Sequence, residues 1–142
     1  MTTVGNTSAP IPAGSYWVGD PCYAFLGYHD VWMACLETSG NENGQTILDA
    51  RGTEVEGQTF QFVASRTLWG DGEYPAYGYG MSFSCPVDAG LIGVVPAAQV
   101  ARLENPPFGM TLVEFPEDFD VSFSEDGMIR IGEIEVFTGG EE

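Results

Sequence analysis

The sequence predicts a single α+β domain dominated by antiparallel β-sheet, with one or two short helices and a C-terminal three-stranded meander. Three observations support this fold class: a length of 142 residues, many turn formers (19 Gly and 9 Pro), and alternation of apolar and polar residues near the C-terminus. Hydrophobic residues make up 44% of the chain, enough for an ordinary core. We expect an extended or mobile lead-in over residues 1–13 and one β-rich domain over residues 14–142.

The first half of the chain predicts short elements separated by turns. Residues 14–18 favour a strand that the turn Gly19-Asp20-Pro21 ends. A helix is expected over residues 29–37, where apolar side chains recur at helical spacing. The other elements expected in this half are strands over residues 46–50 and 59–67 and a tight turn over residues 69–75.

The second half begins with two strands, over residues 81–85 and 90–95. The latter is apolar on both faces, which is typical of a central strand. Pro96 suits the first turn of a short helix over residues 97–103. Residues 111–115 then alternate as a strand does.

The end of the chain predicts the meander. Phe119, Val121 and Phe123 alternate with polar residues, so one face of this strand points inward. Ser124-Glu125-Asp126-Gly127 is suited to a hairpin turn, because glycine adopts a positive φ without strain. Two further alternating strands, residues 129–131 and 134–136, complete three antiparallel strands that pack by one face.

The charge is strongly negative. The chain has no lysine and four arginines against 21 Asp and Glu, for a formal net charge of -17. We expect no direct binding to nucleic acid, since it depends on Lys and Arg neutralising phosphates. We also expect no membrane binding, because the same charge is repelled by membrane surfaces and no apolar stretch is long enough for a span.

The three cysteines are an odd number without Cys-x-x-Cys spacing, which argues against a disulfide framework. They favour a reducing compartment, and we expect a cytoplasmic protein. Cys22 and His29 do not make a convincing nucleophile and base, because an acidic chain disfavours a thiolate. The spacing of His and Cys fits no zinc site and no calcium-loop pattern is present, so we expect no catalytic residue, metal or cofactor. Weak calcium binding to clustered carboxylates stays open, because oxygen-rich acidic loops suit a hard cation.

The acids concentrate near the C-terminus, where residues 104–142 hold 11 of the 21. Carboxylates on alternate positions of a strand lie on one face. We therefore expect an acidic sheet face that binds a basic protein surface, with acids for steering and aromatic side chains for anchoring. The candidate interface residues are Asp118, Asp120, Glu133, Glu135, Phe108 and Phe115. Salt adaptation or solubility would produce the same charge.

Three short motifs place an aspartate in a glycine-adjacent turn, at Asp20, Asp71 and Asp88. If these turns converge, they form a cleft for a small ligand or for hydrolysis, together with Cys22, Tyr23 and Tyr74. Alternatively each aspartate only bonds backbone amides of its own turn.

The same segments resemble a family of small phage and bacterial proteins. The resemblance covers residues 14–96 and is carried by Gly19-Asp20-Pro21-Cys22-Tyr23, Gly70-Asp71-Gly72-Glu73-Tyr74 and Val87-Asp88-Ala89-Gly90. That family has no known activity, so it implies a phage context and no catalytic role for any residue here.

We expect a non-enzymatic, phage-encoded accessory protein that binds and modulates a host protein. Nucleic-acid mimicry in counter-defence or regulation is one way in which its charge would act. Two alternatives remain open: a small-molecule binder or hydrolase that uses the aspartate turns, and a virion decoration protein.

Overall fold

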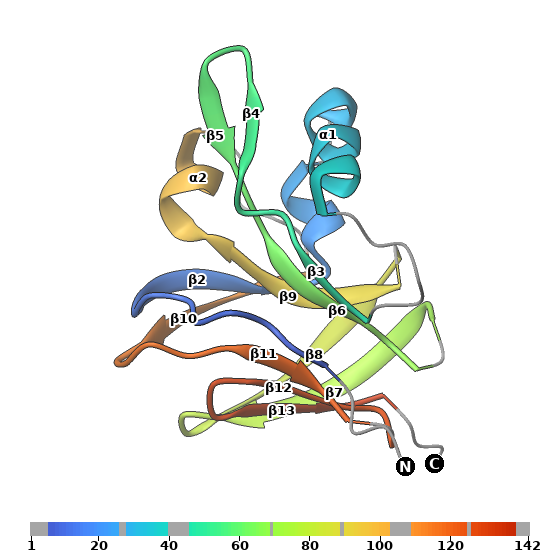
Figure 1. The fold of residues 1–142 in the computed structure, drawn as a ribbon. Helices are drawn as coiled ribbons and strands as arrows, with labels where there is room; N and C mark the ends of the chain where they lie inside the picture. Colours follow the sequence, from blue (N-terminus) through green and yellow to red (C-terminus); the bar gives the residue numbers. More distant parts are fainter. Residues whose placement is uncertain are drawn as a thin grey trace.

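The computed structural model describes residues 6–25, 28–39, 46–68, 70–88, 90–102, 109–124 and 126–138. Two antiparallel sheets pack face to face, and helices with a small hairpin cover the outer side of one sheet (Figure 1). The fold class expected from the sequence, a strand-dominated α+β domain, is confirmed.

The first sheet has six strands and contains the C-terminal meander. Its order is β1 (Asn6–Thr7), β11 (Val121–Phe123), β12 (Met128–Ile131), β13 (Ile134–Phe137), β7 (Gly72–Gly78) and β8 (Met81–Val87). The three-stranded meander is β11, β12 and β13, with Ile129 opposite Val136. Gly127 has φ 91°, which is the conformation that the hairpin after β11 requires of a glycine.

The second sheet has five strands. Its order is β10 (Thr111–Phe115), β2 (Gly14–Gly19), β9 (Leu91–Pro96), β6 (Val63–Arg66) and β3 (Ile47–Asp49). β9 pairs with β2 on one side and with β6 on the other, so the prediction of a central strand is confirmed. A side chain at Gly93 would collide with the Val63 carbonyl and with Ala64, so this position requires glycine.

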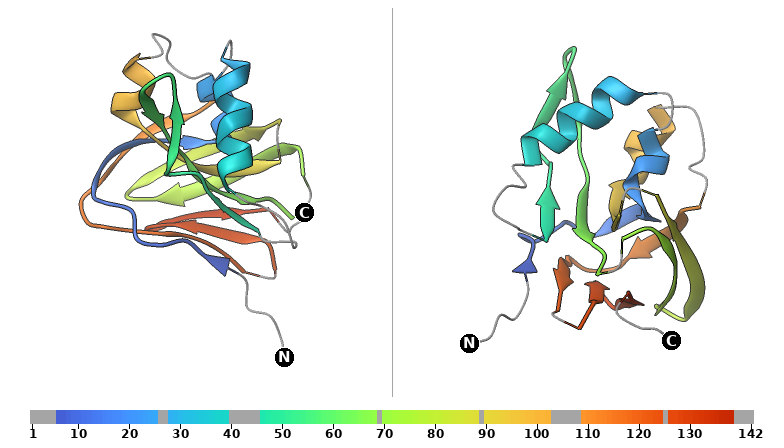
Figure 2. Two further views of the ribbon diagram at one scale, coloured as in Figure 1. Left: turned by 45° about the horizontal axis from the view of Figure 1, so that its top comes forward. Right: turned by 90° about the vertical axis from the view of Figure 1, so that its right-hand side faces the viewer.

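The third layer lies over the outer face of the five-stranded sheet. It contains the 3-10 helix η1 (Pro21–Phe25), α1 (His29–Ser39), α2 (Ala97–Arg102) and the hairpin of β4 (Thr53–Val55) and β5 (Gln58–Phe60). Figure 2 shows α1 and this hairpin on the side opposite the meander. Trp32 of α1 stacks on Phe62 at 5.3 Å between ring centroids, and Phe25 packs against both rings.

The main core lies between the two sheets. The meander contributes alternate residues to this core. The side chains of Val121, Ile129 and Ile131 are fully buried, with 0% exposed. The five-stranded sheet contributes Val18 and Val94, whose side chains belong to the same cluster. The alternation predicted in the sequence is therefore the alternation between this core and solvent.

Two segments differ from the sequence prediction. Residues 59–67 form two strands, because the amide of Gln61 donates to Gln99 Oε1 (2.7 Å) and leaves the ladder between them. Within the expected turn at residues 69–75, the chain from Gly72 onward is strand β7. Pro75 is tolerated there because pairing with β13 involves Ala76 and Tyr77.

Candidate functional site

Three connections between strands meet at one end of the six-stranded sheet and enclose a hollow of about 310 Å³. They are the link from β10 to β11, the turn from β12 to β13, and the turn from β7 to β8. We call the four acidic residues that line the hollow the acidic end: Glu117, Asp118, Asp120 and Glu133. Its other lining residues are Tyr79, Pro116, Phe119 and Gly132, so none of the lining residues is a cation.

Hydrogen bonds fix the backbone around the hollow. The amide of Ala13 donates to Asp118 Oδ1 (3.0 Å), and the amide of Glu133 donates to the Tyr79 hydroxyl (3.1 Å). Tyr79 has φ 50° and begins a tight turn between β7 and β8. A side chain at Gly132 would collide with the Tyr79 hydroxyl, so glycine lets the two turns approach each other.

Three of the four acidic candidates from the sequence, Asp118, Asp120 and Glu133, line this one hollow. Glu135 lies elsewhere, on the outer face of the sheet, where its Oε2 is 3.0 Å from Nη2 of Arg130. The sequence placed the carboxylates along a sheet face, whereas most of them gather at the turns that end the strands. Glu117 was missed, although it directly precedes Asp118 in the acid-rich part of the chain.

Of the two aromatic candidates, Phe115 lies in the described part of the chain, and it does not form a surface anchor. Phe115 is 1% exposed and stacks on Phe119 at 3.8 Å between ring centroids. Its assignment to the interface was wrong, because inward alternation on β10 places it between the sheets. Phe108 lies outside the described residues.

The three aspartate motifs come together in space. Asp20 is 0% exposed, and its carboxylate accepts from the amide of Cys22 (3.0 Å) and from the amide of Asp88 (2.8 Å). Gly72 is opposite Val87 in the ladder of β7 and β8, so Asp71 and Asp88 both lie just beyond its end. Asp71 and Asp88 are exposed.

The contacts within this cluster are those of structural caps. The Tyr74 hydroxyl donates to the carbonyl of Gly70 (2.9 Å). Burial and a hydrogen bond to the Asp88 carboxylate raise the pKa of Tyr23 far above its usual range. Burial, with the nearby Asp20 charge, raises the pKa of the Cys85 thiol to about 12, so this thiol is protonated at neutral pH. A buried carboxylate that accepts from two amides is not available as a general base.

The described residues contain no group of three or more His, Cys, Asp or Glu side chains placed to hold a metal ion. No helix among them is long and apolar enough to cross a membrane.

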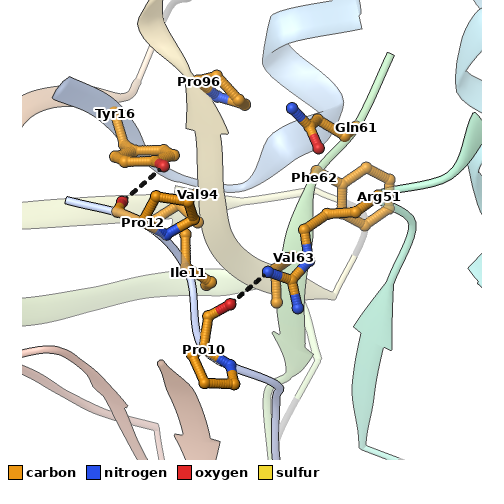
Figure 3. A pocket seen from close by; sticks show the side chains of 10 residues that line it. All are labelled: Pro10, Ile11, Pro12, Tyr16, Arg51, Gln61, Phe62, Val63, Val94 and Pro96. Carbon is orange, nitrogen blue, oxygen red and sulfur yellow. Dashed lines mark hydrogen bonds between the residues drawn. The ribbon is translucent and has the colours of Figure 1, made fainter. Parts of the chain in front are cut away.

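A second hollow, which the sequence did not predict, lies beside the N-terminal segment (Figure 3). Its volume is about 290 Å³. The lining residues are Pro10, Ile11, Pro12, Tyr16, Arg51, Gln61, Phe62, Val63, Val94 and Pro96. They come from four parts of the chain far apart in sequence, so no local pattern could have identified this cavity.

Comparisons with known proteins give no match: no family model, no curated protein and no solved structure matches the chain. The resemblance of residues 14–96 to small phage and bacterial proteins therefore remains an expectation.

Proposed function

We propose that this chain is a non-enzymatic, phage-encoded accessory protein that binds a host protein with a basic surface in the host cytoplasm and modulates it. The observation that supports the proposal is the acidic end, where four carboxylates line one hollow without a cation among its lining residues. Such an arrangement attracts Lys and Arg side chains and accelerates encounter with a basic surface.

Nucleic-acid mimicry is the mode that fits this chemistry. Carboxylates spaced around a hollow present negative charge to side chains that would otherwise bind phosphates. The partner would therefore be a protein whose nucleic-acid-binding surface is blocked, in counter-defence or in regulation.

Charge reversal at the acidic end tests the proposal. The variant carries Glu117→Lys, Asp120→Lys and Glu133→Lys, and it leaves Asp118 in place because that carboxylate holds the Ala13 amide. The control carries Glu54→Lys, Glu56→Lys and Glu73→Lys, which make the same change in net charge at exposed positions on the β4–β5 hairpin and on β7.

Tagged wild type, variant and control are used for affinity capture from host lysate over a salt series, read by mass spectrometry. We expect wild type and control to retain one basic partner that salt releases, and the variant to retain at least about tenfold less. Equal recovery by all three proteins, or no specific recovery by any of them, would contradict the proposal.

A further inference from the structure

The cavity beside the N-terminal segment and the acidic end are neighbours. We call residues 8–13 the strap, because this segment crosses between the two hollows. The amide of Ile11 donates to the carbonyl of Phe119 (2.6 Å), and the amide of Phe119 donates back to Ile11 (2.9 Å). Ile11 lines the cavity, while Phe119 lines the acidic hollow. The cavity and the acidic hollow are therefore separated only by the paired backbone segments at Ile11 and Phe119.

The cavity has the size and the chemistry of a site for one apolar side chain. Its walls are mostly proline, valine, isoleucine and aromatic side chains. Its volume of about 290 Å³ exceeds the roughly 150 Å³ of an apolar cavity that accepts benzene. The Tyr16 hydroxyl is already engaged, since it donates to the carbonyl of Pro12 (2.8 Å).

The charge of the cavity is arranged asymmetrically. Arg51 is paired with Asp49, with Nη2 of Arg51 and Oδ2 of Asp49 2.5 Å apart. It also donates to the carbonyls of Pro10 (2.6 Å) and Ala9 (3.2 Å). Figure 3 shows Arg51 on the side of the cavity opposite Tyr16 and Pro12. Asp118 is next to Pro12, through its bond to the Ala13 amide. A bound segment with cations would therefore leave the cavity on the side of Tyr16, toward the acidic end.

We propose that this cavity receives one bulky apolar side chain of a basic partner segment, whose Arg and Lys side chains lie along the acidic end. The inference rests on the proposed function and specifies what the partner must carry. The cavity supplies the desolvated anchor and the acidic end supplies steering, a division of roles common in protein interfaces.

Matched synthetic peptides test the proposal. Each has four arginines and one phenylalanine, with one to four residues between the phenylalanine and the first arginine, and each has a twin with glycine in place of phenylalanine. Binding to the full chain is measured by fluorescence anisotropy at low salt. We expect at least one phenylalanine peptide to bind at least about tenfold more tightly than its glycine twin. The reason is that the phenyl ring is removed from water when it enters the cavity, and nowhere else on the surface.

Two cavity variants and one control variant locate the anchor. Gln61→Trp covers the mouth of the cavity from its half-buried rim, while Gln58→Trp places the same ring on exposed β5, away from it. Val63→Phe fills the cavity from a buried wall, with thermal unfolding as the check that it folds. We expect Gln61→Trp and Val63→Phe to remove the tenfold preference, and Gln58→Trp to keep it.

The outcomes separate this inference from the proposed function. Equal binding of the twins, or a preference that survives both cavity variants, would overturn the anchor alone. Arginine peptides that bind the charge-reversed variant as well as wild type would overturn the role of the acidic end. Absence of binding by every peptide would overturn both.

Discussion

Asp20 shows how much one side chain can determine at the scale of a residue. Its buried carboxylate joins the start of η1 to the turn after β8 through two backbone amides. We expect Asp20→Ala to lower the free energy of unfolding by about 2–5 kcal/mol, because two partly buried amide donors lose a charged acceptor. Asp20→Asn should cost less, since one oxygen remains.

Urea unfolding of these variants measures the effect of Asp20. Asp71→Ala is the matched control, because Asp71 is exposed and its loss should change stability by no more than about 0.5 kcal/mol. A loss in Asp20→Ala as small as that of the control would show that the caps contribute little.

The buried thiol and phenol predict a dependence of stability on alkaline pH. The pKa values of Cys85 and Tyr23 are raised in the folded chain from 9.0 and 10.0, so these groups stay protonated while the unfolded chain ionises. The stability contributed by Cys85 is therefore fully present below pH 9, and that contributed by Tyr23 below pH 10. Above these values each contribution falls by about 1.4 kcal/mol per pH unit.

Urea unfolding between pH 7 and about pH 10.5 at constant ionic strength tests this dependence. Cys85→Ala should lower the whole curve by creating a cavity, and should make it less steep above pH 9. An unchanged slope would show that Cys85 does not carry the effect. Cys35, whose pKa burial also raises, accounts for part of the slope that remains.

Local chemistry could be predicted at single residues, but their distant partners could not. An aspartate before Pro21 predicted a turn cap, and Asp20 does bond the Cys22 amide two residues on. Its second partner, the Asp88 amide, is 68 residues away, and no turn rule reaches that far. For the same reason Phe115 was mistaken for a surface anchor, since alternation alone does not say which face a strand buries.

At the scale of elements, the strap depends on Arg51. This guanidinium donates to two strap carbonyls, at Ala9 and Pro10. We expect Arg51→Ala to release the strap, so that the amides of Ile11 and Phe119 exchange with solvent about tenfold or more faster.

Hydrogen exchange read at individual amides tests the role of Arg51. Arg66→Ala is the control, because Arg66 is exposed on β6. The hydrogen bond that its backbone amide donates to the Thr46 carbonyl would persist in this variant. Unchanged protection of Ile11 and Phe119 in Arg51→Ala would show that the ladder with Phe119 holds the strap by itself.

Elements with a long, regular pattern were predicted well, and short ones were not. The meander, α1 and β9 follow from periodicity and agree with the structure within two residues. β1 has two residues and is a strand only because β11 pairs with it. The division of residues 59–67 likewise depends on Gln99, a tertiary contact that local propensity does not contain.

For the whole molecule, the net charge of -17 predicts that salt stabilises the fold. Like charges repel more strongly in the compact state, and the screening length falls from about 10 Å at 0.1 M salt to about 3 Å at 1 M. We expect the free energy of unfolding in urea to rise by about 1 kcal/mol or more over this range. The charge-reversed variant should respond less, and a salt response as large as that of wild type would contradict this explanation.

The pairing of β1 with β11 also determines when the six-stranded sheet can form during synthesis on the ribosome. The first strand of the six-stranded sheet must wait for residues 121–123, and β7 waits for β13 at residues 134–137. Until then the meander does not cover the apolar face of the five-stranded sheet, and the nascent chain is prone to associate with its neighbours. The repulsion that weakens the finished fold would keep such chains apart during synthesis.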